Sequence, residues 1–293
     1  MKHKINYEFE DDYDYNEEFG RYKDRRKPKG RRSVRNLKLK DDKKLSSIDE
    51  FDDPNLQELY EQGILTEIIR EIKSGKEATV YLADGQYGLM AAKIYRDEAT
   101  RAFSKDQIYK AGRHISHQNR KKITNLASKN QMKAEQGLWI YHEYKTIWEF
   151  YKAGIRVPKP LIGPSVHDIA KAGRVVLMEY IGNKEEAAPR LSDVSLDKDE
   201  AQDAWQQTFA ILKQVLKLGK VHGDFSTYNL LWWKKQAILI DFPQVVNISE
   251  NKHAKEILKT DLNSLSKSFQ VLGIDKNPKQ LYKELILELG PLF

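Results

Sequence analysis

Residues 221–244, VHGDFSTYNLLWWKKQAILIDFPQ, constrain the fold more than any other stretch of the chain. Two apolar runs in it, 230–233 and 237–240, predict short buried strands. Ionisable or amide side chains stand at the ends of these strands, at His222, Asp224, Asn229 and Asp241. Because such groups are costly to bury alone, the fold must provide a ligand or an opposite charge for them.

The spacing of these polar residues suits phosphoryl transfer from ATP. His222-x-Asp224-x4-Asn229 has the spacing of a protein-kinase catalytic loop, and Asp241-Phe-Pro follows where a kinase has Asp-Phe-Gly. Asp224 would accept a hydrogen bond from the attacking hydroxyl. Asn229 and Asp241 would ligate Mg²⁺, or Mn²⁺ in its place, through oxygen. The pattern also fits small-molecule kinases of the aminoglycoside and choline type, and a purely structural reading makes the polar residues strand caps.

Two upstream residues favour a nucleotide site. Lys93, in AAKIY, lies on a predicted strand and would point inward, where it needs an anion. A helix predicted at about 135–153 carries Glu143 on its apolar face. Glu143 is therefore the natural partner of Lys93 and would hold it toward the phosphates. Taken alone, Lys93 could equally be a surface lysine with a buried stem.

Two further segments supply candidate nucleotide contacts. SGKEATVY (74–81) places one glycine at a turn before a strand, although it is neither a Gly-x-Gly-x-x-Gly loop nor a Walker A motif. The strand predicted at 174–182 leads into a connector. There, after Met178, backbone groups of Glu179 and Ile181 would contact adenine. Only the position of this segment between the two lobes favours a hinge over an ordinary buried strand.

The order of the predicted elements indicates an α+β protein with two lobes and a protein-kinase-like fold. We expect a β-rich N-lobe at 51–178, containing the phosphate loop, the lysine strand, a flexible basic insert and the helix with Glu143. Residues 179–293 would form the hinge and a helical C-lobe with the catalytic and metal-binding loops. The other predicted elements are a helix from Pro54, a hairpin at 77–83 and 88–95, and helices at about 199–218, 254–272 and from Pro278.

Residues 1–50 predict a disordered charged tail, acidic at first and then basic. Residues 1–44 hold 15 Lys or Arg and 10 acids, and so contribute +5 of the chain's net charge of +7. Clustered Lys and Arg can displace phosphate counterions, which makes ribosomal RNA or a pre-ribosomal particle a candidate partner. The alternative is a solvated tail without a dedicated partner.

The composition limits the kinds of metal site and the cellular location that the protein can have. The chain has no cysteine, which excludes disulfides and thiolate metal sites. It has no signal-peptide core at its start and no run of about 18 apolar residues. We therefore expect a cytoplasmic protein without a membrane partner.

The sequence resembles the RIO family of atypical protein kinases over roughly residues 53–272. The segments that carry the resemblance are SGKEATVY, AAKIY, AFSKDQIYKAG, LMEYIG, HGDFSTYN and IDFPQ. By position, the resemblance implies three sets of site residues. The nucleotide-binding residues would be Ser74, Gly75, Lys76, Glu77, Val80, Lys93, Met178, Glu179 and Ile181. The catalytic residues would be Asp224, Lys93 and Glu143, and the metal ligands Asn229 and Asp241.

The resemblance implies a Ser/Thr protein kinase that uses ATP and Mg²⁺ and autophosphorylates, together with ATPase-driven maturation of the small ribosomal subunit. The protein acceptor stays open. Gly223 replaces the Arg that reads a phosphorylated activation loop in other kinases, and Pro243 would prevent the usual flip of the metal-binding motif. No Ala-Pro-Glu follows Asp241, so we expect no peptide-docking segment. A non-catalytic nucleotide sensor is disfavoured, because every catalytic position is filled.

Overall fold

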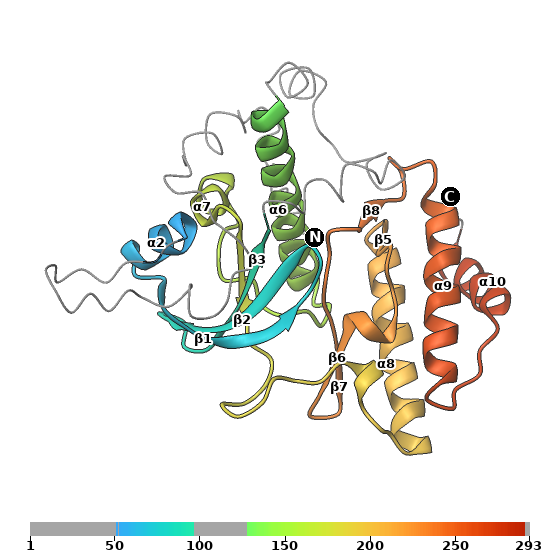
Figure 1. Ribbon diagram of the computed structural model, residues 1–293. Coiled ribbons are helices and arrows are strands. Elements are labelled where there is room, and N and C mark those ends of the chain that lie inside the picture. Colours follow the sequence, from blue (N-terminus) through green and yellow to red (C-terminus); the bar gives the residue numbers. More distant parts are fainter. Residues whose placement is uncertain (1–50, 52, 97–127, 291–293) are drawn as a thin grey trace, which may run out of the picture.

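The computed structural model describes residue 51, residues 53–96 and residues 128–290, with side chains in the long helix from residue 137 onward. The predicted charged tail and most of the predicted basic insert lie outside these residues. Figure 1 shows a sheet on one side of the molecule, helices on the other, and one long helix between them. This arrangement is the two-lobed α+β fold that the sequence predicts.

The N-lobe is built on a four-stranded antiparallel sheet in the order β1-β2-β3-β4. Its strands are β1 (Leu65–Ser74), β2 (Ala78–Gly85), β3 (Met90–Tyr95) and β4 (Val175–Glu179). The β2–β3 hairpin confirms the predicted one. Strand β1 was not predicted, because only Leu65 and Ile68 in it are fully buried and register shifts interrupt its pairing with β2.

Helix α6 (Ser128–Lys152) joins the sheet to the rest of the protein. The hydroxyl of Tyr144 donates to the carbonyl of Val175 at 3.0 Å and accepts from the amide of Leu177 at 2.8 Å. These two bonds fix α6 against β4, and so set the position of every functional group that the helix carries. The prediction of a helix at about 135–153 is confirmed, with several further residues at its start.

Two short helices pack beside the sheet, α2 (Pro54–Glu61) and α7 (Val166–Ala172). The buried Asp53 caps α2 and forms an ion pair with Arg174 at 3.0 Å, directly before β4. The predicted helix from Pro54 is confirmed, whereas α7 was not predicted.

The C-lobe contains three helices, α8 (Lys198–Lys217), α9 (Ala254–Gln270) and α10 (Pro278–Leu289), as predicted. Its short strands form two pairs, β5 (Lys220–Val221) with β8 (Val246–Asn247) and β6 (Leu230–Trp233) with β7 (Gln236–Leu239). Residues 242–253, all of them described, hold only β8 and turns before α9 begins. These described residues thus pass from Asp241 to α9 without a long intervening segment. None of the helices in the described ranges is long and apolar enough to cross a membrane.

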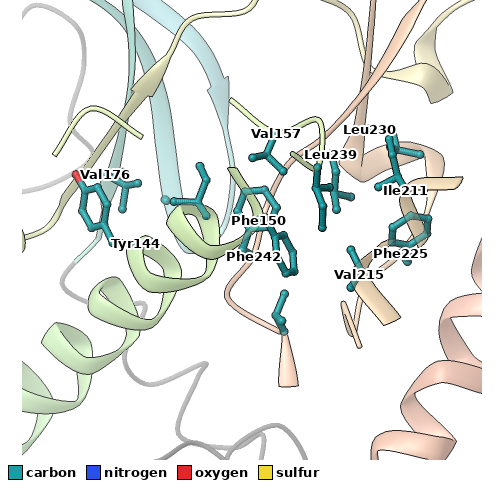
Figure 2. Packing of buried hydrophobic residues seen from close by; sticks show 14 of the residues in the cluster. Tyr144, Phe150, Val157, Val176, Ile211, Val215, Phe225, Leu230, Leu239 and Phe242 are labelled. Carbon is teal, nitrogen blue, oxygen red and sulfur yellow. The ribbon is translucent and has the colours of Figure 1, made fainter. Parts of the chain in front are cut away.

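A single apolar core connects the two lobes. Figure 2 shows Phe150 of α6 against Phe242, which follows the β6–β7 hairpin. Their ring centroids lie 5.7 Å apart at an interplanar angle of 86°, an edge-to-face contact. Since Phe242 directly follows Asp241, this contact positions a predicted metal ligand through packing in the core.

Candidate active site

Lys93 lies at the centre of the candidate site and contacts two carboxylates. Its Nζ is 2.6 Å from Oε1 of Glu143 and 2.7 Å from Oδ1 of Asp241. Burial opposes the positive charge, but the carboxylates of Asp241 and Glu143 outweigh it and raise the pKa of Lys93 well above its ordinary value. The protonated lysine thus joins β3, α6 and the segment after β7 at one point.

Tyr95 completes the surroundings of Glu143. Its buried hydroxyl donates to Oε2 of Glu143, and its ring centroid lies 5.0 Å from Nζ of Lys93. Burial and the neighbouring Glu143 carboxylate raise the pKa of Tyr95. Both oxygens of Glu143, a side chain with 1% exposure, are therefore hydrogen-bonded. Sequence reasoning missed Tyr95, although its spacing of two from Lys93 places both side chains on one face of the strand.

Asp241 is held in an unusual backbone conformation just after the β6–β7 hairpin. Its φ of 69° lies in the left-handed region, which Asp tolerates better than most residues. Burial alone would raise the pKa of Asp241, but the charge and hydrogen bond of Lys93 outweigh it and lower this pKa. The carboxylate is therefore anionic and suited to a cation.

Asn229 organises the loop that is predicted to be catalytic. Its Nδ2 donates to the backbone carbonyl of Asp224 at 2.8 Å and to Oδ2 of Asp224 at 2.7 Å. Because both bonds use the amide nitrogen, the amide oxygen of Asn229 is left as a metal donor. The side chain of Asp224 is exposed, which leaves it accessible to an acceptor from solution.

His222 supports this loop as a neutral residue. It is fully buried, and its Nδ1 accepts a hydrogen bond from the amide of Asp224 at 3.3 Å. Burial lowers the pKa of His222 to about 4, so the imidazole is uncharged at neutral pH. His222 also contacts Phe242 edge to face, with ring centroids 6.0 Å apart, and so links the catalytic loop to the metal-binding segment.

A cavity of about 640 Å³ opens between the sheet and the C-lobe. Most of the predicted site residues line it: Gly75, Lys76, Glu77, Val80, Lys93, Glu143, Met178, Glu179, Ile181, Asn229 and Asp241. The two that do not are Ser74 and Asp224. Asp224 lies next to Asn229 through their hydrogen bond, whereas the hydroxyl of Ser74 accepts from Arg96 at 2.7 Å.

Comparison with known proteins identifies the fold family. The RIO domain matches residues 79–281, which is more than half of the chain. The chain belongs to the RIO family. The match includes the lysine strand, α6, the hinge and both loops of the candidate site.

Relatives of this RIO protein carry kinase names. A Haloferax volcanii protein named "RIO-type serine/threonine-protein kinase Rio1" is 28% identical over 80% of this chain and 74% of its own length. A Caenorhabditis elegans protein named "Serine/threonine-protein kinase RIO1" is 26% identical over 81% of this chain. The matched region is only 44% of that protein, so the chain spans less than half the length of this relative. A crystal structure described as a kinase domain aligns over 71% of this chain and 64% of its own, with a TM-score of 0.43 and 15% identity.

The loop between β1 and β2, which is predicted to bind phosphate, is held at both ends by Arg96. The amide of Arg96 donates to the carbonyl of Glu77 at 2.9 Å, and its guanidinium donates to the hydroxyl of Ser74. Arg96 thereby spans the loop between β1 and β2 and keeps its ends together. No motif marks Arg96 in the sequence, because its role depends on the pairing of three strands.

Asp261 of α9 fixes the loop that contains Gly223 and Phe225. It was not predicted from the sequence. Its two carboxylate oxygens accept the amides of Gly223 at 2.9 Å and of Phe225 at 3.0 Å. Burial raises the pKa of Asp261 to about 7. Gly223 has a φ of 85°, a conformation that favours glycine, which explains why no arginine stands there. An aspartate on the apolar face of the predicted helix 254–272 was the available signal.

Proposed function

We propose that this RIO protein transfers the γ-phosphoryl group of ATP to Ser or Thr hydroxyls, including its own. One observation carries the proposal: Lys93, bonded to both Glu143 and Asp241, faces a cavity that Asn229 also lines. Phosphoryl transfer is mainly positioning and charge stabilisation, and these groups supply a fixed cation beside two oxygen donors for a metal. The names of the relatives support Ser/Thr specificity.

The cavity offers an apolar slot for adenine. Val80 and Ala91 of the sheet line it together with Leu231 and Ile240 of the C-lobe. The carbonyl of Ile181 already accepts the amide of Ala188 at 2.9 Å. The amide of Ile181 and the carbonyl of Glu179 are therefore the backbone groups that we assign to the base edge.

Asn229 and Asp241 would hold Mg²⁺, and Mn²⁺ would suit the same donors. One amide oxygen and one anionic carboxylate fit the preference of Mg²⁺ for few protein ligands, with phosphate oxygens and water in the other positions. When bound, the metal would neutralise charge on the phosphates. Lys93 currently bonds Oδ1 of Asp241, and its second contact, Glu143, keeps it in place when Asp241 serves the metal.

Asp224 would receive the acceptor. Because its carboxylate is exposed beside Asn229, an incoming hydroxyl can donate a hydrogen bond to it. The proton would pass to this carboxylate as the new P–O bond forms, while the bond from the γ-phosphorus to the bridging oxygen breaks and ADP leaves. Residues 242–253, which are described throughout, hold no segment that would select an extended peptide. Water is a second acceptor favoured by this openness, so we include ATPase activity in the proposal.

The cellular role in our proposal follows the resemblance and the charge of the N-terminal tail. We propose that the protein acts in the cytoplasm in small ribosomal subunit maturation, and that the basic stretch within residues 21–44 contacts ribosomal RNA. This part of the proposal rests on charge and on the family, because the tail lies outside the described residues.

The fate of labelled phosphate tests the proposed function. The full chain is incubated with γ-labelled ATP and Mg²⁺, and the label is followed on protein and in solution. We expect acid-stable label on Ser or Thr of the protein itself and some free phosphate, with both lost in EDTA. ATP that stays intact over hours with metal present would contradict the proposal.

A further inference from the structure

Arg190 lies in the wall of the nucleotide cavity, at a position that no motif singled out. Its backbone is held firmly: it forms a β-bridge with Leu231, and its carbonyl accepts the amide of Asp193 at 2.9 Å. The neighbouring carbonyl of Pro189 accepts the amide of Trp232 at 2.9 Å. The C-lobe hairpin thus presents the side chain of Arg190 from a rigid support, next to a residue of the proposed adenine slot.

The guanidinium of Arg190 has no partner among the residues that the structure describes. Within residues 51, 53–96 and 128–290 it forms neither an ion pair nor a hydrogen bond, although it is half-buried. Arg174, in contrast, bonds Asp53 at 3.0 Å. A partly desolvated guanidinium with five unused donors is a favourable place for an anion.

The position of Arg190 relative to the reacting groups points to the phosphates. Arg190 lines the same cavity as Lys93 and Asp241. Asp241 is also the residue that Lys93 contacts. Arg190 and Lys93 therefore face one cavity from two different lobes, and a phosphate chain bound in it could contact both.

The charges around the cavity favour a cation beside the phosphates in addition to Lys93. Its lining includes the cations Lys73, Lys76, Lys93 and Arg190 and the anions Glu77, Glu143, Glu179, Asp193 and Asp241. Lys93 is already bonded to two of these carboxylates, and the two other lysines are exposed. A triphosphate brings further negative charge into this cavity, and Arg190 is a half-buried cation of its wall that can offset part of it.

We propose that Arg190 is a phosphate-binding residue of this site and donates hydrogen bonds to the polyphosphate chain of the nucleotide from the C-lobe. The proposal rests on the proposed function, because it takes a nucleotide as the ligand of the cavity. A planar guanidinium can form two parallel bonds to phosphate oxygens, which an ammonium group cannot. Arg190 would thereby favour nucleotides with phosphates over the nucleoside.

Binding of a graded set of ligands to the full chain tests this inference. ATP, ADP and adenosine are titrated by calorimetry with Mg²⁺, using the wild type, Arg190→Gln and Arg190→Lys. Lys184→Gln is the matched control, since Lys184 is an exposed cation of the same loop outside the cavity. We expect Arg190→Gln to weaken ATP binding by about 10-fold or more, as for a charge-assisted bond, and adenosine binding by less than about 2-fold. Arg190→Lys should recover part of the loss.

Three results separate the possible failures. Unchanged ATP affinity in Arg190→Gln would overturn the inference, and so would equal losses for ATP and adenosine, because Arg190 would then only shape the cavity. A wild-type protein that binds neither ATP nor adenosine would instead overturn the proposed function. Thermal unfolding of each variant accompanies the titrations, and should Arg190→Gln unfold, Arg190→Lys is decisive: ATP affinity equal to wild type would overturn the inference.

Discussion

Replacement of Asp224 by asparagine is expected to lower the rate of phosphoryl transfer by about 10²–10⁴-fold, the usual contribution of a positioned general base. Asparagine keeps the size of the side chain and an oxygen that can accept from Nδ2 of Asn229, as Oδ2 of Asp224 does now at 2.7 Å. It cannot take a proton from the attacking hydroxyl. The rate is measured in single turnover with γ-labelled ATP and Mg²⁺.

ATP affinity should distinguish this effect from damage to the site. Asp224 does not line the cavity, so the Kd of Mg-ATP should stay within about 2-fold in Asp224→Asn, while transfer is lost. Asp275→Asn, an exposed carboxylate after α9, serves as the control and should keep the wild-type rate. Transfer by Asp224→Asn at more than about a tenth of the wild-type rate would remove Asp224 from the catalytic role.

Replacement of Lys93 by methionine is expected to reduce transfer by about 10²-fold or more, as does removal of a fixed transition-state donor in other enzymes. The same change leaves Glu143, with its 1% exposure, without its cation. Loss of one partner of a buried pair destabilises by about 3–5 kcal/mol, so the Tm should fall as well. Activity and thermal unfolding are measured on the same preparation.

A double variant separates stability from catalysis at Lys93. Lys93→Met with Glu143→Gln removes both charges of the buried pair, and a glutamine can still accept from Tyr95. We expect the Tm to recover toward the wild type while transfer stays lost. Lys217→Met, an exposed lysine at the end of α8, is the control. Recovery of transfer together with the Tm would show that Lys93 acts only through stability.

The elements that could be predicted from the sequence are those with a clear periodic pattern of apolar residues. The β2–β3 hairpin and α6 follow from alternation and helical spacing, and the meeting of Lys93 with Glu143 follows because both face the core. The contact of Lys93 with Asp241 was not predictable in this way. It depends on the packing of Phe242 against Phe150, which are far apart in the sequence.

The features that were missed depend on contacts between distant elements. Strand β1 alternates poorly because it is bulged, and only its pairing with β2 defines it. In the sequence, Asp261 resembles an ordinary polar residue of a helix. Its role depends on the amides of Gly223 and Phe225, which donate to its carboxylate only in the folded chain. Ser74 was assigned to the nucleotide from the resemblance, and its role stays a prediction, because the structure places its hydroxyl on Arg96 and outside the cavity lining.

A crystal structure of the full chain with a non-hydrolysable ATP analogue and Mn²⁺ tests the shared nucleotide and metal site most directly. The anomalous signal of Mn²⁺ locates the metal independently of the phosphates. We expect the metal on oxygens of Asn229 and Asp241, the base between Val80 and Leu231, and Lys93 still bonded to Glu143. A metal bound elsewhere, or a nucleotide outside the cavity, would contradict the account.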